Sequence, residues 1–143
     1  MNTHQDDQSV VVLLAEDEAP VRMMAADVLR EQGGFKVVAV VDADEALTVL
    51  EATTDVRALV ADAEMPGSLD GFSLARVVKQ AWPHIGIVVT SGTMAPGPQE
   101  LPPSALFIPR PYRPAELIAA VREVRPALLV ASHSPSPSSK TRS

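Results

Sequence analysis

The chain has no cysteine and few aromatic residues. Cysteine is absent from all 143 residues, and Phe, Trp and Tyr together make up 3% of them. Without thiols, disulfide bonds, thiolate catalysis and cysteine-ligated zinc are excluded. Because the chain is 46% hydrophobic with so few rings, its core must be aliphatic.

Basic residues are outnumbered, and long apolar runs are missing. Lys and Arg number 12 against 18 Asp and Glu, which gives a formal net charge of -6. Nucleic-acid binding needs clustered basic side chains, so direct binding is not expected. Residues 1–9 are polar and acidic, unlike a signal peptide, and no apolar run reaches membrane-spanning length. We therefore predict a cytoplasmic protein without a membrane partner.

Short apolar runs alternate with stretches of helical periodicity. Strands are predicted over residues 10–15, 36–41, 57–61, 85–89 and 105–108. Helices are predicted from Pro20 to Gly33, after the capping-type residues 42–45, from Leu74 to Ala81 and from Pro114 to Pro126. The expected organisation is a flexible N-terminus over residues 1–8, one domain over 9–130 and a disordered Ser/Pro-rich tail over 131–143.

This order predicts an α/β fold with a doubly wound, five-stranded parallel sheet. Each parallel crossover needs a dozen or more residues, so helices must cover both faces of the sheet. Residues 93–103 carry four prolines, which remove backbone donors and clash with a preceding helical turn. Any helix in that segment is therefore expected to be short or broken.

Polar residues follow the predicted strands at the ends where parallel sheets bind ligands. They are Glu16 and Asp17, Asp62, Thr90 and Arg110. A single carboxylate after a strand is usually a helix cap, but the set together favours one site. Carboxylates in contact repel by about 4 kcal/mol per pair at ~4 Å and an effective dielectric of ~20, so a cation must compensate. Oxygen ligands suit Mg2+, and Thr90 and Arg110 could recognise a phosphoryl group.

Four motifs around these residues resemble those of one family. They are Leu-Ala-Glu16-Asp17-Glu, Val-Ala-Asp62-Ala-Glu-Met-Pro-Gly, Val-Val-Thr90-Ser-Gly and Ile-Pro-Arg110-Pro-Tyr. In this order they are similar to the CheY-like receiver domains of response regulators in bacterial two-component signalling. The resemblance spans about residues 10–124 and implies the flavodoxin-like strand order 2-1-3-4-5.

The resemblance implies a single-domain response regulator in a phosphorelay. Asp62 would accept a phosphoryl group from a phospho-His of a sensor histidine kinase or a histidine phosphotransfer protein. Phosphorylation would change the conformation and signal to a downstream protein that the sequence does not identify. Such a protein is not a conventional enzyme: it catalyses its own aspartyl phosphorylation, and whether it also catalyses its dephosphorylation stays open.

The resemblance also assigns roles to individual residues. Asp62 and Asp17 would bind Mg2+ directly and Glu16 through water, and Mn2+ could substitute for Mg2+. The backbone carbonyl of Glu64 would be a further ligand. Thr90 and Phe107 match the switch pair of the family.

Two features depart from the family. Arg110 stands where Lys is usual, before a Pro111 whose peptide bond is expected to be cis. A planar guanidinium is not equivalent to an ammonium, so switching could differ even if phosphoryl binding persists. The proline-rich segment 93–103 replaces a full helix, which predicts unusual partner recognition.

Two other functions stay open. The chain could be a pseudo-receiver, a protein-binding module that works without phosphorylation. A small phosphohydrolase is disfavoured, because such enzymes usually carry a second Asp two residues after the nucleophile, where this chain has Glu64.

Trp82 is expected to pack against the core and His84 to lie at the surface. Residues 127–131 could either form a dimer seam or cover a sheet edge, so a homodimer is left open.

Overall fold

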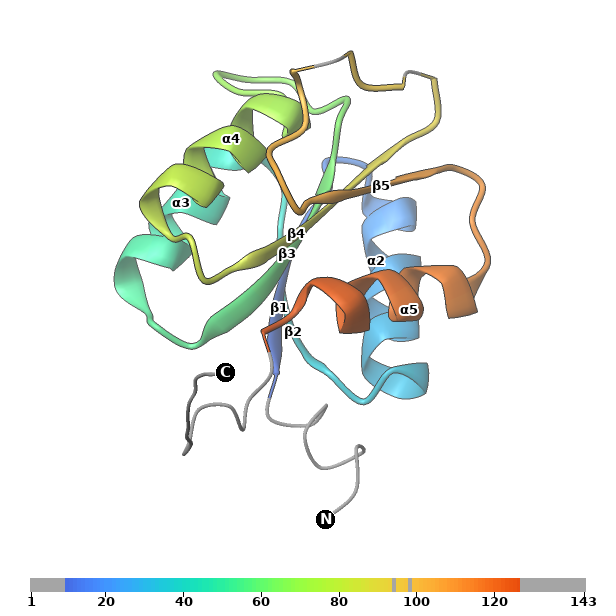
Figure 1. Ribbon diagram of the computed structural model, residues 1–143. Helices are drawn as coiled ribbons and strands as arrows, with labels where there is room; N and C mark the ends of the chain where they lie inside the picture. The colour runs from blue at the N-terminus through green and yellow to red at the C-terminus, as the bar shows by residue number, and fades with distance from the viewer. Residues whose placement is uncertain (1–9, 94, 98, 127–143) are drawn as a thin grey trace, which may run out of the picture.

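The structure is a computed structural model that describes residues 10–93, 95–97 and 99–126 (Figure 1). The expectations for residues 1–8, 127–131 and the tail 131–143 lie outside the described residues. The elements in chain order are β1 (Val11–Ala15), α2 (Ala19–Asp27), η1 (Val28–Gln32), β2 (Lys36–Val40), α3 (Ala43–Ala52), β3 (Val56–Asp62), α4 (Gly71–Ala81), β4 (Gly86–Ser91), β5 (Leu106–Pro109) and α5 (Pro114–Val124).

The sheet has five parallel strands in the order β2-β1-β3-β4-β5, as predicted. Helices α3 and α4 cover one face, whereas α2, η1 and α5 cover the other (Figure 1). The last residue of β3, Asp62, pairs in register with Thr90 of β4. The carboxyl ends of the central strands therefore lie along one edge of the sheet. From this edge the chain continues to a helix on one face or on the other.

The core consists of two aliphatic layers, one on each face of the sheet. Val12, Leu14 and Leu29 are buried in one layer, and Leu13, Leu59 and Ile87 in the other. Trp82 packs against the second layer as predicted, and His84 is exposed. Strand β2 departs from the expected burial on both faces because it lies at the edge of the sheet, where Val38 is 37% exposed.

Helix ends follow local signals in the sequence. Asp42 Oδ1 accepts a hydrogen bond from the Glu45 N–H at 2.9 Å, and Asp70 Oδ1 accepts one from the Ser73 N–H at 2.8 Å. The helix predicted from Pro20 to Gly33 changes its hydrogen bonding part-way: α2 is regular, and η1 is a π-helical turn. That wider turn closes with the Gly33 N–H donating to Val28 O at 3.1 Å.

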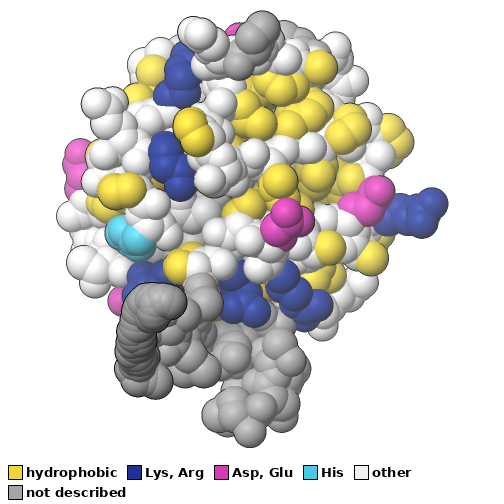
Figure 2. Space-filling view, in the orientation of Figure 1, with side chains coloured by type: hydrophobic (Ala, Val, Ile, Leu, Met, Phe, Trp, Pro, Cys, Tyr) yellow, Lys and Arg dark blue, Asp and Glu magenta, His cyan; other side chains and the backbone are white. Residues whose placement is uncertain are grey.

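The connection between β4 and β5 contains no helix among its described residues, which confirms the prediction of a short or broken helix. Strand β5 also lies at an edge of the sheet, and with no helix among the described residues before it, it is covered less well than the central strands. Leu106, Phe107 and Ile108 are half-buried and Pro109 is exposed. Figure 2 shows hydrophobic side chains gathered over β5 and the segment before it.

Gly71 allows α4 to begin directly against the end of β3. A Cβ at this position would lie 2.2 Å from the Asp62 carbonyl oxygen and 2.7 Å from Ala63 Cα. Gly71→Ala is therefore expected to lower the free energy of unfolding by about 2 kcal/mol or more, measured by urea denaturation. Gly97→Ala is the matched control, because its Cβ would make only an ordinary 3.5 Å contact with Glu100. Equal stability of both variants would contradict this packing.

Candidate phosphoryl-acceptor and metal site

Three acidic side chains meet at the carboxyl edge of the sheet. Glu16 and Asp17 follow β1, and Asp62 ends β3. One carboxylate oxygen from each lies within 4.8 Å of the others. Glu16 and Asp62 are each 3% exposed, so their charges are poorly solvated. The structure therefore brings together the acidic residues that the sequence singled out, and their mutual repulsion requires a nearby positive charge.

Arg110 supplies positive charge to this cluster. Its Nη2 lies 3.3 Å from Asp62 Oδ1, and its Nη1 lies 3.8 Å from Glu16 Oε1. The same Nη2 lies 3.2 Å from Glu64 Oε1. The Arg110–Pro111 peptide bond is cis, as predicted. The guanidinium thus lies among three carboxylates rather than pointing into solvent.

Backbone contacts fix the acidic side chains. Asp62 Oδ1 accepts a hydrogen bond from the Glu64 N–H at 3.1 Å, and Glu16 Oε2 accepts one from the Glu18 N–H at 3.0 Å. Arg22 Nη1 donates to the Glu16 carbonyl oxygen at 2.9 Å, which ties α2 to the end of β1. These contacts aim both carboxylates at the centre of the cluster.

The carboxylate of Glu64 also belongs to the site, whereas the sequence predicted only its backbone carbonyl as a metal ligand. Its carboxylate accepts hydrogen bonds from Ser91 Oγ, from Thr93 Oγ1 at 3.0 Å and from the Gly92 N–H at 3.4 Å. Together with Arg110, these residues give the Glu64 carboxylate hydrogen-bond donors from the ends of both β4 and β5. The hydroxyl residues just after Thr90 could have indicated these contacts, because β3 and β4 are neighbours and their carboxyl ends lie side by side.

The pKa values reflect burial and these contacts. Burial raises the pKa of Glu16 to about 7, with the negative charge of Asp62 adding to the effect and the Glu18 N–H opposing it. Burial also raises the pKa of Asp62, despite the Glu64 N–H and the charge of Arg110. Burial raises the pKa of Glu64 as well, but the hydrogen bonds from Ser91, Thr93 and Gly92 outweigh it, and the pKa is lowered overall.

The raised pKa of Glu16 predicts a pH-dependent stability of the metal-free protein. A carboxyl whose folded pKa exceeds its unfolded value stabilises the fold fully below pH 4.5, and this stabilisation is lost as the pH rises through about 7. The free energy of unfolding in chelator should therefore fall by about 2–3 kcal/mol between about pH 5 and pH 8. Urea denaturation measures it. Glu16→Gln should flatten the dependence, and an unchanged slope in that variant would contradict the assignment.

The donor set fits a divalent cation. Asp17 Oδ1 is buried and has no hydrogen-bond partner among the described residues. A buried carboxylate oxygen without a partner is costly unless a cation or a donor compensates it. Carboxylate and carbonyl oxygens are the ligands that Mg2+ prefers. Glu16, Asp17 and Asp62 could therefore bind a metal ion here.

Of the expected switch pair, Thr90 lies on β4 beside Asp62, and Phe107 lies on the next strand, β5. Thr90 is 4% exposed and adjoins both Asp62 and Ile108 in the register of the sheet. The ring of Phe107 is half-buried and stacks on Phe72 of α4, with centroids 6.3 Å apart and planes inclined by 28°. A displacement at Asp62 could thus reach β5 and α4 through packed neighbours.

The fold and the site together define a class of protein. A doubly wound sheet of order 2-1-3-4-5, with an acidic cluster and the guanidinium of Arg110 at its carboxyl edge, is the architecture of a receiver domain. Residues 12–122, more than half of the chain, match the response regulator receiver domain family. The chain therefore belongs to the response regulator receiver domain family of two-component systems.

Individual relatives agree with this assignment. A response regulator receiver protein from Sinorhizobium medicae is 30% identical, with a TM-score of 0.76 over 81% of this chain and 94% of that chain. The receiver domain of NtrX from Brucella abortus is 27% identical, with a TM-score of 0.67 over 79% of this chain and 97% of that chain. A putative NtrX-like response regulator from Rickettsia bellii is 30% identical over 82 residues, which are 57% of this chain but only 17% of that protein.

Among the described residues, no helix combines the length and apolar character needed to cross a membrane.

Proposed function

We propose that the protein is a single-domain response regulator that accepts a phosphoryl group on Asp62. The donor is a phospho-His on a sensor histidine kinase or a histidine phosphotransfer protein in the cytoplasm. The observation that carries this proposal is the buried Asp62 at the end of β3, within 4.8 Å of the Glu16 and Asp17 oxygens and in contact with Arg110. Residues 9–130 would be the receiver domain.

The chemistry follows from the position of Asp62. A carboxylate oxygen attacks the phosphorus, an O–P bond forms, and the P–N bond to the donor imidazole breaks, leaving the electron pair on nitrogen. Mg2+, held by Asp17, Asp62, the Glu64 carbonyl and, through water, Glu16, would neutralise charge on the phosphoryl oxygens. Mn2+ could replace it.

The protein's own residues complete the phosphoryl site. Arg110 is already charged and within contact of Asp62, so it can donate to a phosphoryl oxygen without crossing the site. Thr90 is the neighbour of Asp62 on β4 and can donate its hydroxyl to another oxygen. Movement of Thr90 would change the space available to Phe107 on β5, which gives two conformations that a downstream protein can distinguish.

Labelling with a small phosphodonor or a histidine kinase tests the proposal. We expect a stoichiometric label that requires Mg2+, is stable in acid and is labile in base, because it is an acyl phosphate. Chelation of the metal should suppress labelling. Absence of label with both kinds of donor would reject the proposal.

A pseudo-receiver is the second candidate. Two observations favour it: Arg110 already pairs with Asp62, and the β4–β5 connection has no helix among its described residues. Such a protein would bind its partner equally well with and without a phosphodonor. Mg2+ affinity in the ordinary range for receivers, combined with labelling, would count against it.

The arrangement of Glu64 disfavours a phosphohydrolase. A hydrolase needs an acid at this position to protonate the leaving group. The Glu64 carboxylate accepts from Ser91, Thr93 and Arg110, and its lowered pKa keeps it ionised. Turnover of phosphomonoesters without a stable label would be needed to revive this function.

A further inference from the structure

We infer that the Glu64 side chain is a positioning residue for Arg110. It shares the guanidinium with Asp62 and thereby sets how strongly Arg110 competes with a divalent cation for the acidic cluster. The inference rests on the proposed function for the metal site, but it concerns the interaction between two residues of this chain.

The geometry shows a shared cation. One nitrogen of Arg110, Nη2, lies 3.2 Å from Glu64 Oε1 and 3.3 Å from Asp62 Oδ1. The side chain of Glu64 is more exposed than that of Asp62, 29% against 3%. The guanidinium therefore bridges a buried acceptor, which belongs to the acidic cluster, and a more accessible acceptor at its border.

Glu64 is itself held in place from the other side. Ser91 Oγ and Thr93 Oγ1 both donate to Oε2, whereas Arg110 and the Gly92 N–H contact Oε1. Oε2 thus fixes the carboxylate to the β4 end, and Oε1 is shared between the Gly92 N–H and Arg110. This division of contacts is what a residue that orients a neighbour requires.

Charge makes Arg110 and a divalent cation competitors. A metal ion bound by Glu16, Asp17 and Asp62 would lie close to the guanidinium, and like charges repel most where solvent is excluded. Glu64 offers Arg110 a second acceptor outside the cluster. When Glu64 is present, Arg110 can keep an ion pair while its contacts with Glu16 and Asp62 weaken.

A double-mutant cycle on metal affinity tests this, with Mg2+ or Mn2+ alone and no phosphodonor, by titration calorimetry. Arg110→Gln should tighten binding by about tenfold, since a competing cation is removed. Glu64→Gln should weaken binding by about threefold, since Arg110 then pairs only with Asp62 and Glu16. In the Arg110→Gln background, Glu64→Gln should have almost no effect, because it acts through Arg110.

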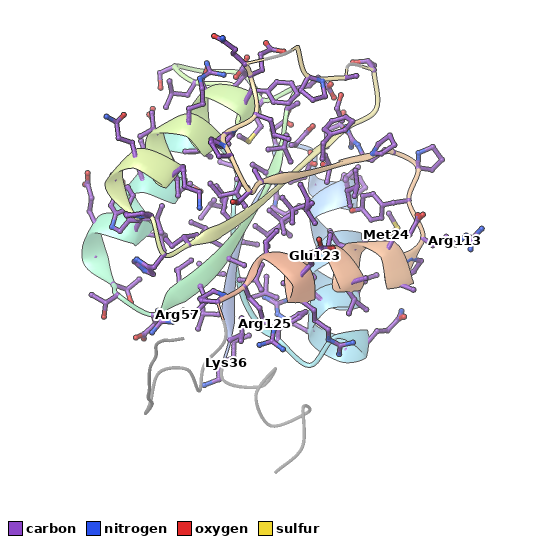
Figure 3. The ribbon with its side chains drawn as sticks, in the orientation of Figure 1. Met24, Lys36, Arg57, Arg113, Glu123 and Arg125 are labelled. Carbon is purple, nitrogen blue, oxygen red and sulfur yellow. The ribbon has the colours of Figure 1, made fainter. Side chains whose placement is uncertain are left out.

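Two controls keep the test decisive. Lys36→Gln makes the same change of net charge as Arg110→Gln. Lys36 is the first residue of β2, at the amino ends of the strands and away from the carboxyl edge (Figure 3), so this variant should leave metal affinity unchanged. Arg110→Lys keeps the positive charge and should bind metal less tightly than Arg110→Gln. Thermal unfolding verifies that each variant is folded.

The outcomes separate clearly. Unchanged or weaker binding by Arg110→Gln overturns the competition, and an equal effect of Glu64→Gln in both backgrounds overturns the positioning role. If the wild-type protein takes up phosphoryl label but the two substitutions have additive effects on metal affinity, the proposed function stands and this inference is wrong. Binding by Arg110→Gln but not by wild type would support it most strongly.

Discussion

Asp62→Asn is expected to reduce phosphoryl labelling by about 100-fold or more, because the variant lacks the nucleophilic oxygen of the carboxylate. Asn has nearly the same shape, so the Glu64 N–H can still donate to its side-chain oxygen, as it does to Asp62 Oδ1. Loss of labelling would then reflect chemistry rather than unfolding. Incubation with a small phosphodonor and Mg2+, followed by mass spectrometry of the intact protein, measures the effect.

Asp55→Asn is the matched control for this experiment. Asp55 is an exposed carboxylate just before β3, at the end of the strand opposite to Asp62. The two variants make the same change of charge at opposite ends of β3, and only one changes the buried site. Equal labelling of Asp62→Asn and wild type would place the acceptor elsewhere, whereas loss of labelling in both variants would indicate a general effect of charge.

The layout of the sheet and the acidic residues could be predicted because they depend on local features. Apolar runs such as residues 10–15 become parallel strands wherever helices alternate with them, and parallel strands end at the same edge. Glu16 and Asp17 follow β1 and Asp62 ends β3, so their meeting required only the strand order. The prolines of residues 93–103 likewise act through their own backbone, because each removes a backbone donor. The structure accordingly has no helix among the described residues of this segment.

The detailed contacts of the site could not be predicted, since they depend on side-chain geometry across the edge. Only the backbone carbonyl of Glu64 was predicted at the site, and the neighbouring β4 end shows that Ser91 and Thr93 both donate to its carboxylate. Arg110 was expected to serve a phosphoryl group, but the sequence does not show that it also contacts Glu16 and Glu64. The length and fork of the guanidinium, which reaches several carboxylates at once, explain why this position differs from one with Lys.

Arg110, in place of the usual Lys, changes how the negative charges around Asp62 are compensated. Four carboxylates lie here, those of the acidic cluster (Glu16, Asp17 and Asp62) and that of Glu64 at its border, and Arg110 is close to three of them. Asp17 is the exception, because its Oδ1 is buried without a hydrogen-bond partner among the described residues. The positive charge of Arg110 therefore compensates the cluster unevenly, and Asp17 depends most on a metal ion.

Asp17→Asn is accordingly expected to weaken Mg2+ binding by about 30-fold or more, since it removes the charge of a direct ligand. In the metal-free state the same change should raise the free energy of unfolding, because it relieves repulsion with Glu16 and Asp62. Titration calorimetry with Mg2+ measures the affinity, and urea denaturation in chelator measures the stability. Opposite signs for metal binding and apo stability are the signature of a carboxylate kept for a ligand rather than for folding.

Glu18→Gln is the control that separates direct ligation from general electrostatics. Glu18 is exposed and next but one to Glu16, so its loss makes the same change of net charge close to the cluster. It should weaken metal binding by about twofold or less, because solvent and salt screen an exposed charge. Similar losses in Asp17→Asn and Glu18→Gln would mean that the cluster attracts the ion only through its overall charge. A large loss in Asp17→Asn alone would mean that its buried, unpaired oxygen binds the ion.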